Sequence, residues 1–205
     1  MNMAETLKKA IAAGFMIGIG AVIYISCENK IAGALLFTVG LFAVCAFGMN
    51  LFTGKIGYII SNKNKPNCIV IWIGNFLGAI TGMALVRIAK PSLHTAAREM
   101  MSAKLQQSYI GIPILAFFCG VLMYLAVENY RANPHGFGKV AGLFLCVSVF
   151  ILCGFEHSIA DMCYAVLAVE SIEEALRYLF FLVVVSVFNG AGALAVRWLT
   201  VKKEA

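Results

Sequence analysis

Long apolar runs constrain the fold of this chain more than any other feature. They lie near residues 8–26, 31–60, 68–88, 108–130, 138–168 and 172–200. A membrane-spanning helix needs about 20 mostly apolar residues, so each run is long enough to cross a bilayer. The sequence therefore predicts an all-α integral membrane protein with six transmembrane helices.

The overall composition also favours a membrane protein. Of 205 residues, 61% are hydrophobic and 13% are charged, and the mean hydropathy is +0.89. Soluble domains average about 45–50% apolar and about 25% charged residues. The net charge of +6 is spread thinly between the apolar runs, which is typical of membrane orientation signals rather than of nucleic-acid binding. We expect one transmembrane domain over residues 1–205, surrounded by lipid and without a separate soluble domain.

The cysteines and the first apolar run indicate neither cofactor nor cleavage. The seven cysteines form no CxxC pair and do not cluster with histidine, so we expect no disulfide framework, metal site or cofactor. The first run ends at Cys27, a position that resembles a lipoprotein cleavage site. The preceding Tyr24-Ile25-Ser26 fits such cleavage poorly, and five more apolar runs follow. We therefore expect an uncleaved first helix.

Glycine and polar residues interrupt two of the six runs near mid-membrane. The second run contains Gly48-Met49-Asn50-Leu51-Phe52-Thr53-Gly54, and the fifth contains Cys153-Gly154-Phe155-Glu156-His157-Ser158. Glycine lowers helix propensity, and backbone freed from a helix must face protein or water rather than lipid. We expect the second and fifth helices to be broken.

The interruptions occupy corresponding places in two three-helix halves, about 8–88 and 108–200. An Asn-x-x-Gly unit also recurs in the third run of each half, at Asn75 and Asn189. Because three crossings place the second half in the opposite orientation, the repeat is predicted to be inverted. Paired broken helices in inverted halves indicate a transport site near the membrane midplane.

The distribution of Lys and Arg predicts the orientation. With both termini in the cytoplasm, the cytoplasmic segments hold ten Lys and Arg residues against six outside. The cytoplasmic ten are Lys8, Lys9, Lys55, Lys63, Lys65, Arg131, Lys139, Arg197, Lys202 and Lys203. Arg87, Lys90, Arg98 and Lys104 fall in the external loop between the halves.

His157 is the leading candidate for a functional residue. An ionisable side chain at membrane depth costs about 2.5–3.5 kcal/mol at a helix centre and is usually kept for a pathway or a proton relay. The alternative is a neutral imidazole that bonds the backbone of the helix break. Histidine exchanges a proton near neutral pH, which a passing weak-acid anion could use. His94 and His135 fall in predicted loops and carry no such expectation.

Other polar residues near the breaks have two interpretations each. Glu156 either accepts N–H bonds from the broken backbone, which we favour, or lines the path. Thr53 either donates a hydroxyl to an anion or to His157, or satisfies the backbone of its own break. Lys139, at the start of the fifth run, is either an orientation signal, which we favour, or a residue that acts on the substrate. Asp161 is expected to face a partner helix or a vestibule.

Two segments carry a resemblance to a known family. Leu51-Phe52-Thr53-Gly54 and Gly154-Phe155-Glu156-His157-Ser158-Ile159-Ala160-Asp161-Met162 resemble the signature segments of the formate/nitrite transporter family. The resemblance implies a homopentamer of aquaporin-like protomers, each with its own pore. It also implies passage of formate, nitrite, hydrosulfide or related small monocarboxylates.

The resemblance implies roles for individual residues. His157 would be the central pore histidine, Thr53 its partner, and Lys139 a lysine that draws anions by its positive field. The apolar constrictions would be Phe37, Leu41, Leu51 and Phe150, and the paired asparagines would be Asn75 and Asn189. Asn50 departs from the pattern, because the family commonly has an acidic residue there. The chain is also short, with brief termini and a compact connection at 131–138, which argues against gating by a long N-terminal helix.

The combined expectation is a channel or transporter for small anions of weak acids, with formate or nitrite first and hydrosulfide next. Proton transfer would occur at the central histidine. The protein would be a homopentamer of the bacterial inner membrane, with both termini cytoplasmic, and not an enzyme. The alternatives are an aquaporin-like neutral pore, for which the paired Asn-Pro-Ala units are absent, and a non-transporting membrane subunit. A redox subunit or a membrane enzyme is a further alternative. The sequence argues against it, because its three histidines are too far apart to form a haem or metal set and it has no nucleotide-binding glycine motif.

Overall fold

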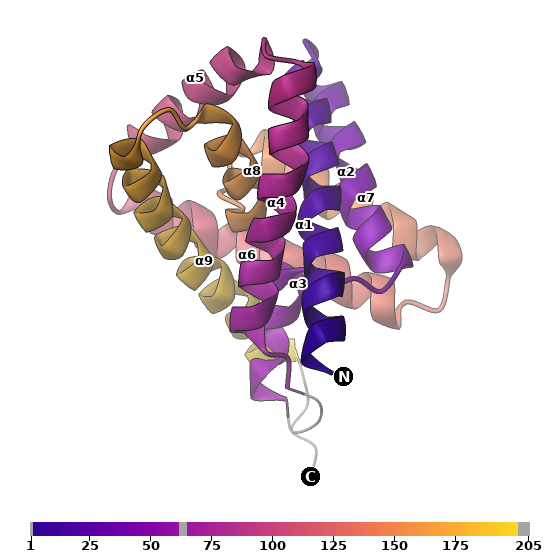
Figure 1. Cartoon of the computed structure of the whole chain (residues 1–205). Helices are drawn as coiled ribbons and strands as arrows, with labels where there is room; N and C mark the ends of the chain where they lie inside the picture. Colours follow the sequence, from indigo (N-terminus) through magenta and orange to yellow (C-terminus); the bar gives the residue numbers. More distant parts are fainter. Residues whose placement is uncertain (1, 62–64, 201–205) are drawn as a thin grey trace.

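The computed structural model describes residues 2–61 and 65–200, which form an all-helical bundle (Figure 1). Its helices are α1 (Met3–Ser26), α2 (Lys30–Ala46), α3 (Phe52–Lys55), the 3-10 helix η1 (Ile56–Ile60), α4 (Cys68–Ala89), α5 (Leu93–Leu105), α6 (Gly111–Ala132), α7 (Gly136–Leu152), α8 (Ser158–Ala168) and α9 (Ile172–Thr200). Lys63, Lys202 and Lys203, assigned to the cytoplasmic side by the sequence, lie outside the described residues.

Among the described residues, four helices have the length and apolar character needed to cross a membrane. These are α1, α4, α6 and α9, whereas α2, α7 and α8 are shorter apolar helices. The all-helical fold predicted from the sequence is confirmed. A count of six crossings requires α2 to be joined with α3 and η1, and α7 with α8, and it stays a prediction.

The chain leaves a regular helix at both predicted interruptions. α2 ends at Ala46 and α3 begins at Phe52, while α7 ends at Leu152 and α8 begins at Ser158. Gly48 has a φ of +60° and Gly154 a φ of +67°, and these are the two glycines with positive φ among the described residues. A side chain with a Cβ rarely adopts this left-handed conformation, so glycine lets the backbone turn out of each helix.

Glycines bring the two long helices of each half, α1 with α4 and α6 with α9, into close contact. A Cβ on Gly14 of α1 would lie 2.0 Å from the Asn75 carbonyl oxygen of α4. In the second half, a Cβ on Gly120 of α6 would lie 2.0 Å from the Asn189 carbonyl oxygen of α9. Small residues at such crossings allow two helix backbones to approach closely. The same packing solution therefore positions both asparagines.

The structure corrects the sequence prediction for residues 93–105, which had been assigned to a loop. They form α5, which lies across the end of the bundle opposite the N-terminus (Figure 1). Leu93, Ala97 and Met101 are its buried residues, and their spacing of four places them on one face of the helix. α5 thereby covers α8, the helix that follows the second break.

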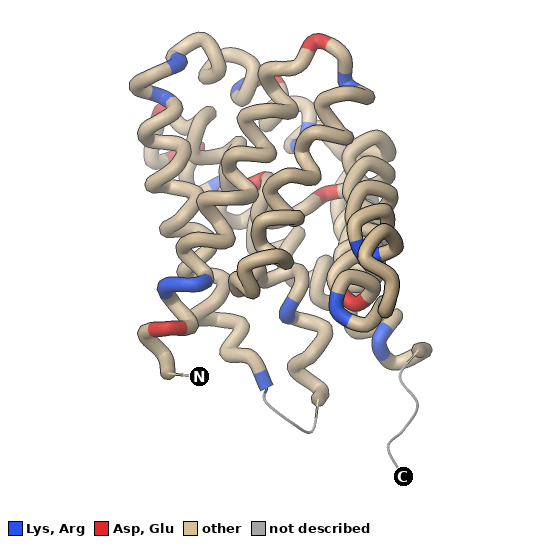
Figure 2. Tube along the Cα trace, turned by 90° about the vertical axis from the view of Figure 1, so that its right-hand side faces the viewer, with Lys and Arg blue, Asp and Glu red and all other residues tan. Residues whose placement is uncertain are grey.

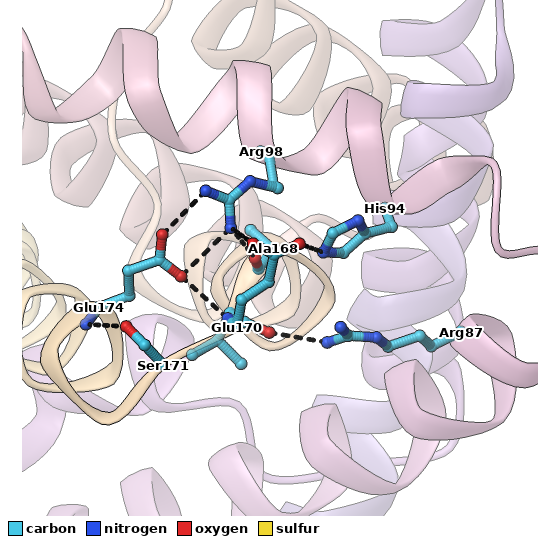
Figure 3. Close-up of polar contacts among 8 residues, drawn as sticks. Arg87, His94, Arg98, Ala168, Glu170, Ser171 and Glu174 are labelled. Carbon is cyan, nitrogen blue, oxygen red and sulfur yellow. Dashed lines mark hydrogen bonds and ion pairs between the residues drawn. The ribbon is translucent and has the colours of Figure 1, made fainter.

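Polar contacts fasten α5 to the turn between α8 and α9 (Figure 3). The Arg98 guanidinium donates to both carboxylate oxygens of Glu174, at 2.9 and 3.2 Å, and lies 2.9 Å from a carboxylate oxygen of Glu170. Arg98 also donates to the Ala168 carbonyl, and Arg87 donates to the Val169 carbonyl. These carbonyls end α8, where a helix leaves acceptors unsatisfied and favours positive charge.

Charged positions gather toward the two ends of the bundle, and its middle is mostly uncharged (Figure 2). The start of α1 and the end of α9 lie at the same end (Figure 1). A long apolar girdle between charged ends is the arrangement that a bilayer requires. We describe the chain as a multi-pass membrane protein on this basis.

Candidate functional site

The two helix breaks meet at His157 and Thr53. The imidazole Nε2 of His157 lies 2.9 Å from the hydroxyl Oγ1 of Thr53, although the residues are 104 positions apart in the chain. Their side chains are 2% and 1% exposed. The structure therefore joins the polar residues of the two halves at one buried point.

The second nitrogen of His157 fixes which tautomer fits the structure. Nδ1 accepts a hydrogen bond from the Ala160 backbone N–H at 3.0 Å, so His157 is the N-cap of α8. A nitrogen that accepts this bond carries no proton, and the proton of the neutral ring is then on Nε2. Nε2 donates to Thr53 in this tautomer, which leaves the Thr53 hydroxyl proton free for another acceptor.

Asn75 supports the break between α2 and α3. Its Oδ1 accepts from the Phe52 N–H at 2.8 Å, at the start of α3. Its Nδ2 donates to the Asn50 carbonyl at 2.9 Å and to the Ala10 carbonyl of α1 at 2.8 Å. One fully buried side chain thus binds two backbone groups of the break and ties them to a carbonyl of α1.

Asn189 makes the corresponding bonds in the second half. Its Oδ1 accepts from the Ser158 N–H at 3.0 Å, and its Nδ2 donates to the Glu156 and Ala116 carbonyls, both at 2.8 Å. Both asparagines therefore bind the first N–H of the half-helix and a carbonyl of the break. The asparagine side chains therefore hold the backbone of the two breaks in place.

Glu156 has side-chain partners that the sequence did not indicate. Its carboxylate, fully buried, accepts from Lys104 Nζ and, at 2.7 Å, from Gln107 Nε2. Lys104 also lies 3.0 Å from Asp161 Oδ1. The expectation that the Glu156 carboxylate accepts backbone N–H bonds is wrong, because among the described residues its partners are these two side chains.

Lys104 is the residue that the sequence analysis missed. It stands near the end of α5, and its side chain is 15% exposed. Burial by itself would lower the pKa of this ammonium, but the carboxylates of Asp161 and Glu156 outweigh burial and raise its pKa above the ordinary value. Lys104 therefore stays charged at neutral pH. The four-residue spacing of Leu93, Ala97 and Met101 was the available signal, because it indicates the helix that carries Lys104.

Aromatic rings adjoin the histidine on one side. The Phe150 ring stacks on the His157 ring with centroids 5.4 Å apart, and it meets Phe37 edge to face at 6.1 Å. Phe37, Phe150, Leu41 and Leu51 are all buried, with at most 3% exposure. The structure thus brings two of the four predicted constriction residues into direct contact. The other two lie in the same apolar core.

A cavity of about 300 Å³ adjoins the first break, next to Thr53. It is lined by Leu51 and Gly54 of the first break and by Lys139 of α7. Lys55 and Arg131 also line it. Lys139 lies over the Tyr130 ring, 5.8 Å from its centroid. The residues beside Thr53 therefore border a hollow whose charged side chains are cations.

The geometry defines a class of protein. Two interrupted helices meet at a buried polar pair between apolar rings and a cationic hollow, as in a membrane channel or transporter. A model of the family described as "Formate/nitrite transporter" matches residues 1–202. The chain belongs to this family, whose members are channels and transporters rather than enzymes.

Curated relatives are similar over much of the chain. The formate channel FocA of Escherichia coli K12 is 24% identical over 182 residues, which cover 77% of this chain and 64% of that protein. A probable formate transporter of Methanothermobacter thermautotrophicus is 27% identical over 161 residues, covering 65% of this chain and 59% of the other. The chain thus spans less than two thirds of the length of these relatives.

Solved structures share the fold. A pentameric formate channel with formate bound aligns with a TM-score of 0.80 at 24% identity, covering 96% of this chain and 95% of that one. A channel described as an FNT family ion channel aligns with a TM-score of 0.86 at 20% identity, covering 98% and 92%. These likenesses establish the channel fold of the protomer.

Proposed function

We propose that this protein forms a transmembrane pathway for small monovalent anions of weak acids, with formate and nitrite as the leading substrates and hydrosulfide next. The 2.9 Å contact between His157 and Thr53 carries the proposal. It places a hydroxyl donor and a proton-exchanging ring at the meeting point of two helix breaks. Family membership and the formate channels among its relatives support the same substrate class.

Passage begins at the cationic cavity. Lys139 draws anions toward Leu51 by a positive field that apolar walls strengthen. Beyond the cavity the path is apolar, and loss of water disfavours the charged form of a weak acid. A desolvated anion therefore gains a proton more readily there than in bulk water.

The His157 and Thr53 pair supplies the polar step. Because Nδ1 of His157 is engaged by Ala160, exchange of a proton is confined to Nε2 and the Thr53 hydroxyl. A proton from the aqueous side passes to the anion by way of Nε2, which takes up the new proton as it gives up its own, so the ring is neutral before and after the transfer. The neutral acid then passes the layer of Phe150 and Phe37. The anion forms again in water on the far side.

Lys104 reduces the repulsion that the Glu156 carboxylate would exert on an anion near His157. A free carboxylate beside His157 would oppose anion entry, but Lys104 and Gln107 hold the Glu156 carboxylate on the α5 side. Lys104 also binds Asp161, so one cation serves two buried carboxylates. We infer that α5 acts as a structural cover whose Lys104 offsets part of the negative charge behind the site.

The arrangement in the cell follows from the same observations. We infer an inverted repeat of about 8–88 and 108–200, because Asn75 and Asn189 bind equivalent atoms in the two halves. We propose a bacterial inner membrane, and we infer cytoplasmic termini because Lys55, Lys65 and Arg131 line one cavity with Met3 of α1, and Lys139 lines the neighbouring cavity with Lys55 and Arg131. A homopentamer is proposed from the pentameric formate channel of similar fold.

Flux measurements in proteoliposomes test the proposed function. Vesicles that hold a pH-sensitive dye receive inward gradients of formate, nitrite, hydrosulfide, acetate or glycerol. We expect anion-dependent pH changes above the protein-free leak, reduced about 100-fold or more by His157→Ala, which is the lower end of what a positioned proton-transfer group contributes. His135→Ala, in an exposed loop, is the matched control. Absence of any anion response, with or without glycerol passage, would sink the proposal.

A further inference from the structure

Lys55 occupies an unusual place beside the proposed pathway. It is the last residue of α3, two positions after Thr53, and it is half-buried. It lines the 300 Å³ cavity together with Leu51 and Lys139. It also lines a larger cavity of about 750 Å³, which opens beside Asn50. Lys55 therefore stands where the wider hollow continues into the narrower one.

Ion pairing does not account for Lys55. Within residues 2–61 and 65–200, its ammonium has no hydrogen-bond or ion-pair partner. The charged neighbours that act on it are Lys9 and Arg131, which are themselves cations, and the remaining group is the Cys45 thiol. Lys9 is paired with Glu5 at 2.9 Å and Arg131 with Glu128 at 2.5 Å. Lys55 is the member of this basic group that lacks a carboxylate.

Helix capping does not account for Lys55 either. A lysine at the end of a helix is favourable because the last carbonyls are left unsatisfied. α3 does not end freely, since Ile56 is helical and η1 continues directly to Ile60. Among the described residues, the half-buried charge therefore has no structural partner, although burying a lysine costs free energy.

We propose that Lys55 recruits the permeating anion and selects for its charge at the inner end of the entry cavity, one step before Thr53. This inference rests on the proposed function of the pore. An unpaired cation between low-dielectric walls concentrates monovalent anions and excludes cations. Lys139 provides the same charge from α7, so an anion entering the narrow cavity meets a lysine from each half of the chain.

Substitution of Lys55 tests this inference through the concentration dependence of formate influx. Lys55→Gln is expected to raise the half-saturating formate concentration about threefold at low ionic strength, the effect of one unit charge acting through largely aqueous surroundings. The difference should shrink in about 1 M of an impermeant salt, where the Debye length is about 3 Å. Lys55→Arg should restore the wild-type value. Lys9→Gln, a paired lysine on the same side, is the matched control and should change little.

The outcomes separate this inference from the proposed function. A wild-type protein that carries no anion overturns both. Transport by wild type with an unchanged half-saturating concentration in Lys55→Gln overturns only the role of Lys55. A loss that is independent of ionic strength and is not restored by Lys55→Arg shows a structural role and also overturns it. Lys55→Glu reverses the charge of the side chain, so its half-saturating formate concentration should rise further than that of Lys55→Gln.

Discussion

The imidazole Nε2 of His157 lies 2.9 Å from the hydroxyl Oγ1 of Thr53, and this contact joins the two halves of the chain at their helix breaks. Neither residue belongs to a regular crossing helix, because Thr53 is in the four-residue α3 and His157 caps α8. His157 is held by the hydrogen bond from the Ala160 N–H to its Nδ1, and Thr53 is positioned by the short helix α3. The contact thus depends on the geometry of both breaks.

The Thr53 hydroxyl is expected to be required for rapid flux. Thr53→Val keeps the shape of the side chain but removes the acceptor of the Nε2–H and the donor to the anion. We expect formate flux in proteoliposomes to fall about tenfold, the effect of a lost hydrogen bond of about 1.4 kcal/mol. Thr53→Ser retains the hydroxyl and should keep most of the flux. Equal rates for the valine and serine variants would contradict this role.

Asn189 is expected to stabilise the second break strongly. Asn189→Ala removes the partner of the Ser158 N–H and of the Glu156 and Ala116 carbonyls. An unsatisfied buried group costs about 1–3 kcal/mol, so unfolding should occur at a clearly lower temperature. Reaction of the buried thiols with a fluorescent maleimide during heating in detergent reports this change. Asn29→Ala, which removes an exposed N-cap, should cost only about 1 kcal/mol. A shift no larger than that control would contradict the prediction.

The free-energy cost of substituting Gly154 is expected to depend on how well the new residue adopts a positive φ, and not on the size of its side chain. A Cβ at Gly154 would meet nothing within 4 Å, but its φ is +67°. Gly154→Val should therefore cost about 1–3 kcal/mol from backbone strain alone. Gly154→Asn should cost less, since asparagine enters the left-handed region more readily. Gly136→Val is a suitable comparison, because that glycine also has open space and lacks a positive φ. Thermal unfolding in detergent measures all three variants.

Removal of the Lys104 ammonium is expected to lower the free energy of unfolding, because two buried carboxylates lose their cation. Lys104→Met leaves Glu156 and Asp161 without their shared cation, and breaking a buried pair in this way typically costs about 3–5 kcal/mol. The variant should unfold at a lower temperature. Adding Glu156→Gln should recover part of the loss, because one uncompensated charge is removed. If the double variant were less stable than Lys104→Met, the ion pairs would not be the cause. Lys90→Met, at the exposed end of α4, is the control.

Close helix packing is expected to fail when Gly120 gains a side chain. A Cβ there would lie 2.0 Å from the Asn189 carbonyl oxygen, so α6 and α9 must separate. Gly120→Ala should lower stability by at least about 1–3 kcal/mol, as overpacking does elsewhere. Asn189 moves with α9, so formate flux should fall as well. Retained stability and flux would show that the helices part without disturbing the break.

The sequence by itself determined the helical membrane fold and the residues at the two breaks. Long apolar runs identify crossing helices, because in lipid the backbone can satisfy its hydrogen bonds only within a helix. Glycine and polar residues within such a run mark where the backbone leaves the helix and must contact protein or water instead. His157 and Thr53 could be chosen for the same reason, since polar groups at that depth are costly. The lipid environment is uniform, so these signals are local in the sequence and need no knowledge of contacts.

Only the tertiary structure decided which groups satisfy one another. Lys104 looked like a loop charge, yet the fold of α5 brings it to Glu156 and Asp161. Lys55 looked like an orientation signal, yet it lines two cavities and has no carboxylate partner in the part of the chain that the structure describes. A charge in the sequence does not reveal its depth or its neighbours. Those depend on how helices distant along the chain pack, because electrostatic energy is set by distance and burial.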